Sequence, residues 1–153
     1  MNKRPRNTLG STDFRKRKTG YREPRPRFLV VCEGEKTEPN YFKAFPVPST
    51  DVVDVVGLGA NTVSLVNEAE RLKALKPYEQ VWCVFDRDSF LPAQFNGAIQ
   101  LAEQKGMRTA YSNEAFELWY LLHFDYHDAA LSRSQYTEKL SQSLDVAYKK
   151  NLR

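Results

Sequence analysis

The sequence predicts an α/β domain in which about four mostly parallel strands alternate with helices. Short apolar runs rich in β-branched residues recur along the chain, and each is followed by a segment with helical periodicity or helix-capping residues. Two of these runs, at 28–32 and 81–85, end abruptly in acidic residues. Alternation of this kind is typical of a parallel sheet that is covered by crossover helices.

The length of 153 residues predicts one folded domain with a core of ordinary size. No apolar run is long enough to span a membrane, and no apolar segment follows the N-terminal charges as in a signal peptide. We therefore expect a cytoplasmic protein without a membrane partner. Cys32 and Cys83 fall inside predicted strands and are expected to be free thiols, the alternative being a disulfide or a metal pair.

Charge is distributed unevenly along the chain. Residues 1–27 contain ten Lys and Arg and two acidic residues, whereas the other 126 residues contain thirteen and seventeen. We predict that residues 1–26 form a basic arm that is disordered when free, and that 27–153 form the folded domain. The arm is expected to contact nucleic-acid phosphates, unless it is only a solubilising leader. The candidate contacts are Arg15, Lys16, Arg17 and Lys18.

Strands are predicted at 27–32, 51–56, 80–85 and 107–111, and helices at 37–45, 62–75, 92–104, 114–124 and 134–150. The first helix follows Thr37 or Glu38 as its cap, with Pro39 at its first position. The second follows Asn61 or Thr62 and has an apolar stripe at helical spacing.

Later elements rest on similar signals. Gly106 is placed to end the helix at 92–104 in a left-handed conformation. The segment 114–124 is aromatic and apolar, which indicates a helix that is buried on more than one side. The helix at 134–150 is expected to bury Leu140, Leu144, Ala147 and Tyr148. The chain ends directly after this helical pattern without a cap signal, which is compatible with a truncated product or fragment.

Asp86 and Asp88 end the third predicted strand. Residues two apart in an extended backbone point to the same face, so the two carboxylates should lie side by side. Like charges at that distance repel each other unless a cation lies between them, and Mg²⁺ prefers such hard oxygen ligands. Alone, the motif is also compatible with an ordinary strand end or helix cap.

A second acidic segment follows the first strand and strengthens the metal hypothesis. Glu33 and Gly34 come directly after 28–32, and Gly34 allows a sharp turn. Parallel strands place their carboxyl ends at one edge of a sheet, where ligands bind, so we expect Glu33 to meet Asp86 and Asp88. Lys36 is a candidate phosphate ligand, or else a solvated surface charge. Candidates for a supporting role around the site are Glu35, Glu38, Arg87, Asn113 and Glu117.

These segments together resemble the RloB family. The resemblance rests on the sequences at 30–42, 84–88 and 112–124, and it covers residues 27–150. The family is associated with abortive phage infection and is similar to the Toprim fold of topoisomerases and primases. That fold carries a Glu-Gly after its first strand and an Asp-x-Asp after its third, which Glu33, Gly34, Asp86 and Asp88 match.

The resemblance implies a Toprim-like nuclease that acts in phage defence. Mg²⁺, or Mn²⁺ in its place, is then the expected cofactor, and Glu33, Asp86 and Asp88 are the expected metal-binding and catalytic residues. It also implies an AAA- or ABC-type ATPase partner, and DNA or RNA as the substrate. The alternative is a noncatalytic nucleic-acid-binding or regulatory subunit of a defence complex that contains an ATPase.

Overall fold

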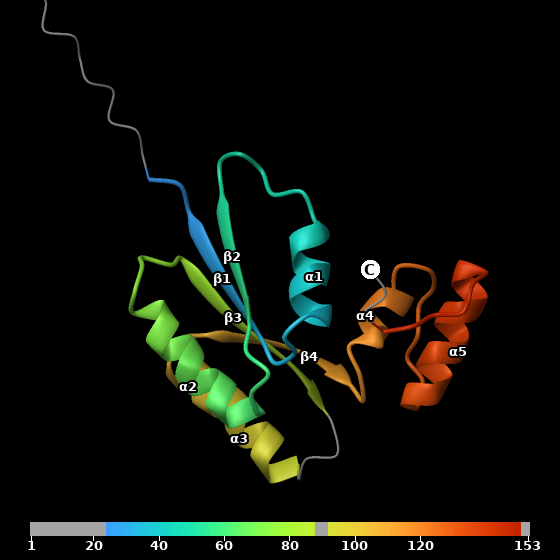
Figure 1. Cartoon of the computed structure of the whole chain (residues 1–153). Coiled ribbons are helices and arrows are strands. Elements are labelled where there is room, and N and C mark those ends of the chain that lie inside the picture. The colour runs from blue at the N-terminus through green and yellow to red at the C-terminus, as the bar shows by residue number, and fades with distance from the viewer. Residues whose placement is uncertain (1–23, 88–91, 151–153) are drawn as a thin grey trace, which may run out of the picture.

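The structure is a computed structural model that describes residues 24–87 and 92–150 (Figure 1). In chain order the elements are β1 (Arg27–Cys32), α1 (Thr37–Ala44), β2 (Val52–Gly57), α2 (Thr62–Lys73), β3 (Gln80–Arg87), α3 (Pro92–Gln104), β4 (Arg108–Asn113), α4 (Glu117–Leu121) and α5 (Arg133–Leu144). The predicted alternation of strands and helices is confirmed, and the bounds of β1 and α3 are those expected.

The four strands form one parallel sheet in the order β2-β1-β3-β4. β1 lies between β2 and β3, so that Cys32 pairs with Gly57 on one side and with Val84 on the other. The chain passes from β1 through α1 to β2, and then through α2 across β1 to β3. The direction of winding therefore reverses between β1 and β3, which is the point where open α/β sheets bind ligands.

Alternate residues of the strands build two cores. On one face, Leu29, Val31, Val81, Cys83 and Phe85 pack against α2 and α3. On the other face, Val30, Cys32 and Val84 pack with Phe116, and α1 contributes Tyr41 and Phe42. Figure 1 shows α2 and α3 on the opposite side of the sheet from α1.

The alternation also settles the state of the two cysteines. Cys32 and Cys83 lie on opposite faces of the sheet, and both are buried, free thiols. Burial raises the pKa of each to about 12, and for Cys32 the nearby charge of Glu38 contributes to the rise. They are therefore core residues, as the sequence predicted.

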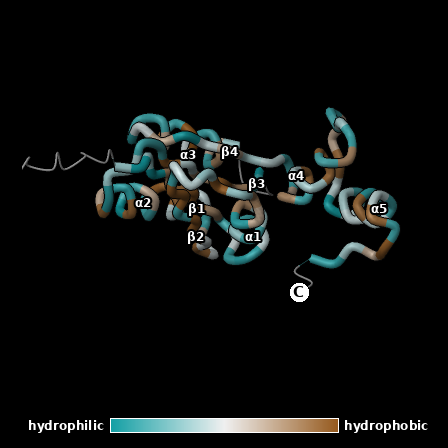
Figure 2. Tube along the Cα trace, turned by 90° about the horizontal axis from the view of Figure 1, so that it is seen from above, coloured by the Kyte–Doolittle hydropathy of each residue, from teal (hydrophilic) through white to brown (hydrophobic). Residues whose placement is uncertain are grey.

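The two last helices form a third, smaller core. Ala115, Leu121, Leu131, Tyr136 and Leu140 are its buried members. α4 and α5 lie beyond β4, apart from α2 and α3, and the view in Figure 2 shows the same separation. α5 begins with a capping box formed by Ser132 and Gln135.

Several predicted bounds differ from the structure, most of all at the ends of β3 and β4 and in the last two helices. β3 continues to Arg87, because Asp86 and Arg87 still pair with β4. α4 begins only at Glu117, since Glu114 adopts a left-handed conformation with φ of 67°, and the helix ends at Leu121. α5 ends at Leu144, where Asp145 is left-handed with φ of 55°. Leu144 and Ala147, which were expected to be buried, are consequently exposed, and the chain beyond α5 folds back toward α4.

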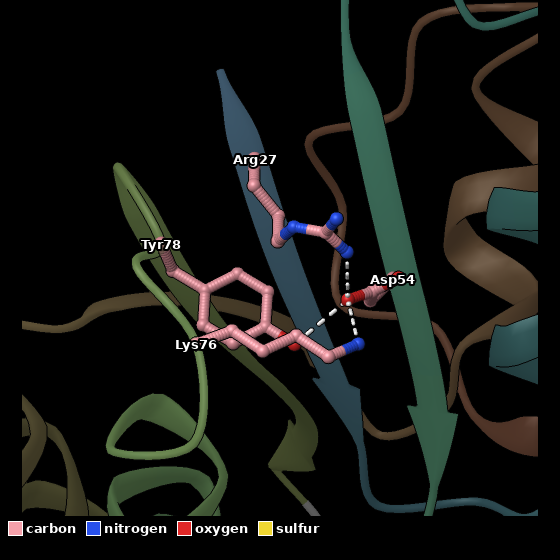
Figure 3. A network of polar contacts seen from close by, with 4 residues as sticks. All are labelled: Arg27, Asp54, Lys76 and Tyr78. Carbon is pink, nitrogen blue, oxygen red and sulfur yellow. Dashed lines mark hydrogen bonds and ion pairs between the residues drawn. The ribbon is translucent and has the colours of Figure 1, made fainter. Parts of the chain in front are cut away.

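A polar network fastens the opposite end of the sheet (Figure 3). Oδ2 of Asp54, on β2, accepts hydrogen bonds from Arg27 at 3.1 Å, Lys76 at 3.0 Å and Tyr78 at 2.7 Å. These partners come from β1 and from the loop before β3.

Within the described part of the chain, no helix combines the length and the apolar content that crossing a bilayer requires.

Candidate functional site

Glu33 and Asp86 meet where the winding of the sheet reverses. The backbone N–H of Glu33 donates to the carbonyl of Val84 at 2.9 Å, which extends the pairing of β1 with β3 by one residue. The N–H of Asp86 in turn donates to Oε2 of Glu33 at 3.1 Å. The carboxylate of Glu33 is thus held against the backbone of Asp86, and the two acidic strand ends lie together as the sequence predicted.

Gly34 makes room for a third carboxylate. A Cβ atom at this position would overlap the carboxyl group of Glu38, so any other residue would require that side chain to move. Glu38 lies in the first turn of α1 and is buried, as are its neighbours Thr37 and Pro39. The Glu-Gly pair therefore turns the chain and also lets the Glu38 carboxyl pack against the loop after β1.

Burial raises the pKa of the Glu38 carboxyl above its ordinary value. Its own backbone N–H, at the start of α1, opposes the rise, whereas the negative charges of Asp86 and Glu117 add to it. An elevated pKa means that the folded protein holds this carboxylate at an energetic cost. Glu38 was expected only in a supporting role, yet its carboxylate is close enough to Asp86 for the two negative charges to interact.

Asp86 faces the same side of the sheet as Val84, toward α1 and α4. Burial raises the pKa of its carboxyl, and the charge of Glu117 raises it further. A short hydrogen bond from the Ser112 hydroxyl to Oδ1, the charge of Lys150 and a hydrogen bond from the backbone of Phe116 all lower the pKa without cancelling the rise.

Glu117 is the fourth carboxylate, and it begins α4. The residue is only 6% exposed. Its Oε1 accepts a hydrogen bond from Tyr148 at 3.3 Å and lies 3.4 Å from Nζ of Lys150, whereas its Oε2 is buried without a hydrogen-bond partner among the described residues. The sequence singled out Glu117 as an acidic residue in an apolar segment, but it gave no sign that Tyr148 and Lys150 would return to it.

We call Glu33, Glu38, Asp86 and Glu117 the carboxylate cluster. Lys150 is a half-exposed cation on its edge. Within the cluster, the negative charges of Glu38, Asp86 and Glu117 repel one another. Such an arrangement is typical of sites that bind cations or transfer protons.

Other predicted site residues lie further out. Lys36 is exposed at the start of α1, and Glu35 is exposed with its carboxylate over Gly59 rather than toward Asp86. Arg87 points to the opposite face of the sheet, where its guanidinium lies 5.8 Å from the centre of the Phe95 ring. Asn113 is exposed, and its backbone carbonyl accepts from Tyr136 at 3.1 Å. Asp88, Arg15, Lys16, Arg17 and Lys18 lie outside the described residues.

The cluster suits a hard cation by the chemistry of its donors. Every donor is a carboxylate oxygen, and the buried Oε2 of Glu117 lacks a partner within the described segments. In residues 24–87 and 92–150, no three His, Cys, Asp or Glu side chains are close enough to hold one ion together. Mg²⁺ commonly takes only one or two protein carboxylates and fills its other positions with water and phosphate, so pairs within the cluster fit it.

Comparison with known proteins supports the resemblance noted from the sequence. The family model described as RloB-like protein matches residues 28–153, which is most of the chain. The parallel four-stranded sheet with alternating helices is consistent with a Toprim-like fold. No curated protein and no solved structure matches the chain significantly.

Proposed function

The chain belongs to the RloB-like family, and on that premise we propose that it is a metal-dependent phosphodiesterase that cleaves nucleic acid. The contact of Glu33 with Asp86 carries the proposal, because it joins the two acidic strand ends at the reversal of the sheet. Ligands of open α/β sheets bind at this place. The raised pKa values of Asp86 and Glu38 support it, because they mark charge that the fold leaves uncompensated.

Asp86 is the proposed central metal ligand, together with Asp88 from the sequence motif and Glu33 beside it. Glu117, whose Oε2 is buried without a partner among the described residues, would support the ion through water. Mg²⁺ or Mn²⁺ would neutralise charge on the phosphoryl oxygens and lower the pKa of an attacking water. Ser112 fixes the orientation of the Asp86 carboxylate through its hydrogen bond to Oδ1.

Glu33 is the proposed proton carrier of the site. The N–H of Asp86 anchors Oε2 of its carboxylate, so the side chain is oriented toward the end of β3. From there it would accept a proton from an attacking water or return one to the leaving oxygen. Lys36 and the basic arm would bind phosphates on either side of the scissile bond.

The biological setting belongs to the same proposal. The resemblance of the three sequence segments to the RloB family implies phage defence, in which the protein would act together with an AAA- or ABC-type ATPase. The unevenly distributed positive charge, with ten Lys and Arg in residues 1–27, supports a polyanionic substrate. The substrate would be DNA or RNA.

A cleavage assay tests the proposal. Labelled single-stranded and duplex DNA and RNA are incubated with the full chain in Mg²⁺, in Mn²⁺ and in EDTA. We expect metal-dependent cleavage, loss of at least about a hundredfold in rate for Asp86→Asn, and a fall mainly in kcat for Glu33→Gln with substrate binding retained. Asp54→Asn, at the other end of the sheet, is the matched control and should cleave at the wild-type rate.

A noncatalytic role is the second candidate, and one observation favours it. Among the described residues, no three potential ligands converge on one point. A nucleic-acid-binding or regulatory subunit of an ATPase complex would need no such convergence. Tight nucleic-acid binding without cleavage in Mg²⁺ or Mn²⁺, with and without an ATPase partner, would support this role against the first.

A further inference from the structure

A pocket between α1 and α4 opens on the same face of the sheet as the carboxylate cluster. Its volume is about 390 Å³. The lining residues are Asn40, Tyr41, Ala44, Phe45, Tyr120 and His123. Four of these six carry aromatic rings, and neither the fold nor the proposed catalytic chemistry accounts for a hollow of this kind.

The rings of the pocket are held in place and remain accessible. Phe45 is 46% exposed, and its ring stacks on His123 with centroids 6.1 Å apart and an interplanar angle of 27°. The Tyr41 hydroxyl and Nε2 of His123 are hydrogen-bonded at 2.9 Å, which fixes both rings. Tyr41 meets Phe45 edge-on at 5.0 Å. An open, ordered aromatic wall of this kind offers a stacking surface for a flat ring.

The pocket connects to the carboxylate cluster through a single layer of side chains. The ring of Tyr41 lies 5.2 Å from that of Phe116, whose backbone hydrogen-bonds to Asp86. Tyr120 donates a long hydrogen bond of 3.4 Å to the carbonyl of Thr37, the residue before Glu38. A ligand in the pocket would therefore lie next to the proposed reaction site.

A polar stripe on α1 runs alongside the pocket. Lys36, Asn40 and Lys43 follow helical spacing and are all exposed, and the N–H of Asn40 donates to the carbonyl of Lys36. At 1.5 Å per residue, the two lysines are separated by about 10 Å along the helix. The stripe thus has positive charges for a phosphate backbone and, in Asn40 at the pocket itself, an amide for the edge of a base.

We infer that this pocket binds one unpaired nucleobase of the substrate, while the backbone follows Lys36 and Lys43 toward the carboxylate cluster. The inference rests on the proposed function and adds to it the substrate class: single-stranded nucleic acid, or a strand with an extruded nucleotide. The stacked pair of Phe45 and His123 and the flanking lysines favour a base over an aliphatic side chain of a partner protein.

Binding of a labelled ten-nucleotide oligoadenylate to the full chain tests the inference, with the matching duplex as competitor. The experiment is done in EDTA, so that cleavage has no part in it. We expect preference for the single strand, a loss of about 5- to 100-fold in affinity for Phe45→Ala and Phe45→Leu, and near wild-type affinity for Phe45→Tyr. Phe124→Ala removes a ring that is 50% exposed but lies outside the pocket, so it should change nothing.

Tryptophan fluorescence locates the bound base. The chain has two tryptophans, and the ring of Trp119 lies 5.9 Å from that of Tyr41. In a Trp82→Phe background, adenosine monophosphate should quench Trp119 in the wild-type pocket and not in the Phe45→Ala variant. Circular dichroism of each variant checks that it is folded.

The outcomes separate this inference from the proposed function. The base pocket is overturned if Phe45→Ala binds the single strand as tightly as the wild type, or if Phe45→Leu keeps wild-type affinity. This holds even if Mg²⁺-dependent cleavage is found. If Phe45→Ala and Phe45→Leu lose single-strand binding while Phe45→Tyr and Phe124→Ala keep it, the base pocket is supported. This holds even if no substrate is cleaved and the catalytic proposal fails.

Discussion

The two ends of the sheet shift the pKa values of their buried or half-buried carboxyl groups in opposite directions. At one end, Asp54 accepts hydrogen bonds from Arg27, Lys76 and Tyr78 (Figure 3). Desolvation alone would raise the pKa of Asp54, but these three bonds outweigh it and the pKa is lowered. At the carboxyl end, the pKa values of Glu38 and Asp86 are raised, because burial and mutual repulsion exceed the few favourable contacts.

The difference indicates what each end contributes. The Asp54 network connects β1 and β2 to the loop before β3. Burial and the hydrogen bond to Asp54 raise the pKa of Tyr78 to about 12. That network stabilises the fold. At the carboxyl end, the raised pKa values of Glu38 and Asp86 mean that their ionised forms cost stability, and a site that retains such a cost is the expected place for function.

The largest predicted effect is a difference in sign between matched substitutions at the two ends. Asp54→Asn should lower the free energy of unfolding by about 1–2 kcal/mol, because two cations and a hydroxyl lose their charged acceptor. Glu38→Gln should raise it by about 1 kcal/mol, because it removes a carboxylate that burial and like charges disfavour. Urea denaturation near neutral pH, in EDTA, measures both. A loss of stability in both variants would show that the cluster is as well compensated as the Asp54 network.

The pH dependence of the same variants should also run in opposite directions. The pKa of Asp54 is depressed, so its contribution to the free energy of unfolding is present above its ordinary pKa. This contribution is lost as the pH falls through the pKa of the folded state. The pKa of Glu38 is raised, so its contribution to the free energy of unfolding is present below its ordinary pKa. This contribution is lost as the pH rises through the pKa of the folded state.

Repeating the urea series toward about pH 4, near the ordinary carboxyl pKa, measures this dependence. Relative to the wild type, the loss of unfolding free energy in Asp54→Asn and the gain in Glu38→Gln should both shrink as the pH is lowered. The stabilities of the two variants therefore approach that of the wild type from opposite sides. Curves that stay parallel from neutral to acidic pH would contradict the assigned shifts.

Lys150→Gln should have the smallest effect on stability, under about 1 kcal/mol, because the ion pair with Glu117 is half exposed. It removes a cation that competes for the cluster, so Mg²⁺ affinity measured by titration calorimetry should rise about two- to fivefold. Lys149→Gln changes the neighbouring exposed residue and serves as the control. Weaker Mg²⁺ binding in Lys150→Gln would instead give Lys150 a role in positioning the cluster.

Much of the fold follows from local sequence signals. The bounds of the strands and of the first three helices could be predicted within a few residues. They follow from the apolar runs, the Asn61 cap and the left-handed Gly106. The length of α4 could not be predicted, because the aromatic periodicity from 114 to 124 is equally compatible with a helix and with the turns that surround it. The left-handed Glu114 and Asp145 carry no glycine signal either.

The site divides in the same way. The meeting of Glu33 and Asp86 follows from parallel strands with acidic ends, which the sequence displays. The central position of Glu38 depends on the space above Gly34, and that of Glu117 on the turn after β4 and the returning segment with Tyr148. These are tertiary contacts, so the sequence could place both residues only near the site.

The response of the fold to metal tests the central claim most directly. If the cluster is held for a divalent cation, Mg²⁺ at about ten times its Kd should stabilise the native protein by roughly 1.4 kcal/mol, seen as a rise in Tm. Asp86→Asn should remove this response, and Asp54→Asn should keep it in full. A wild-type Tm that Mg²⁺ and Mn²⁺ leave unchanged, or an equal rise in Asp86→Asn, would contradict the account.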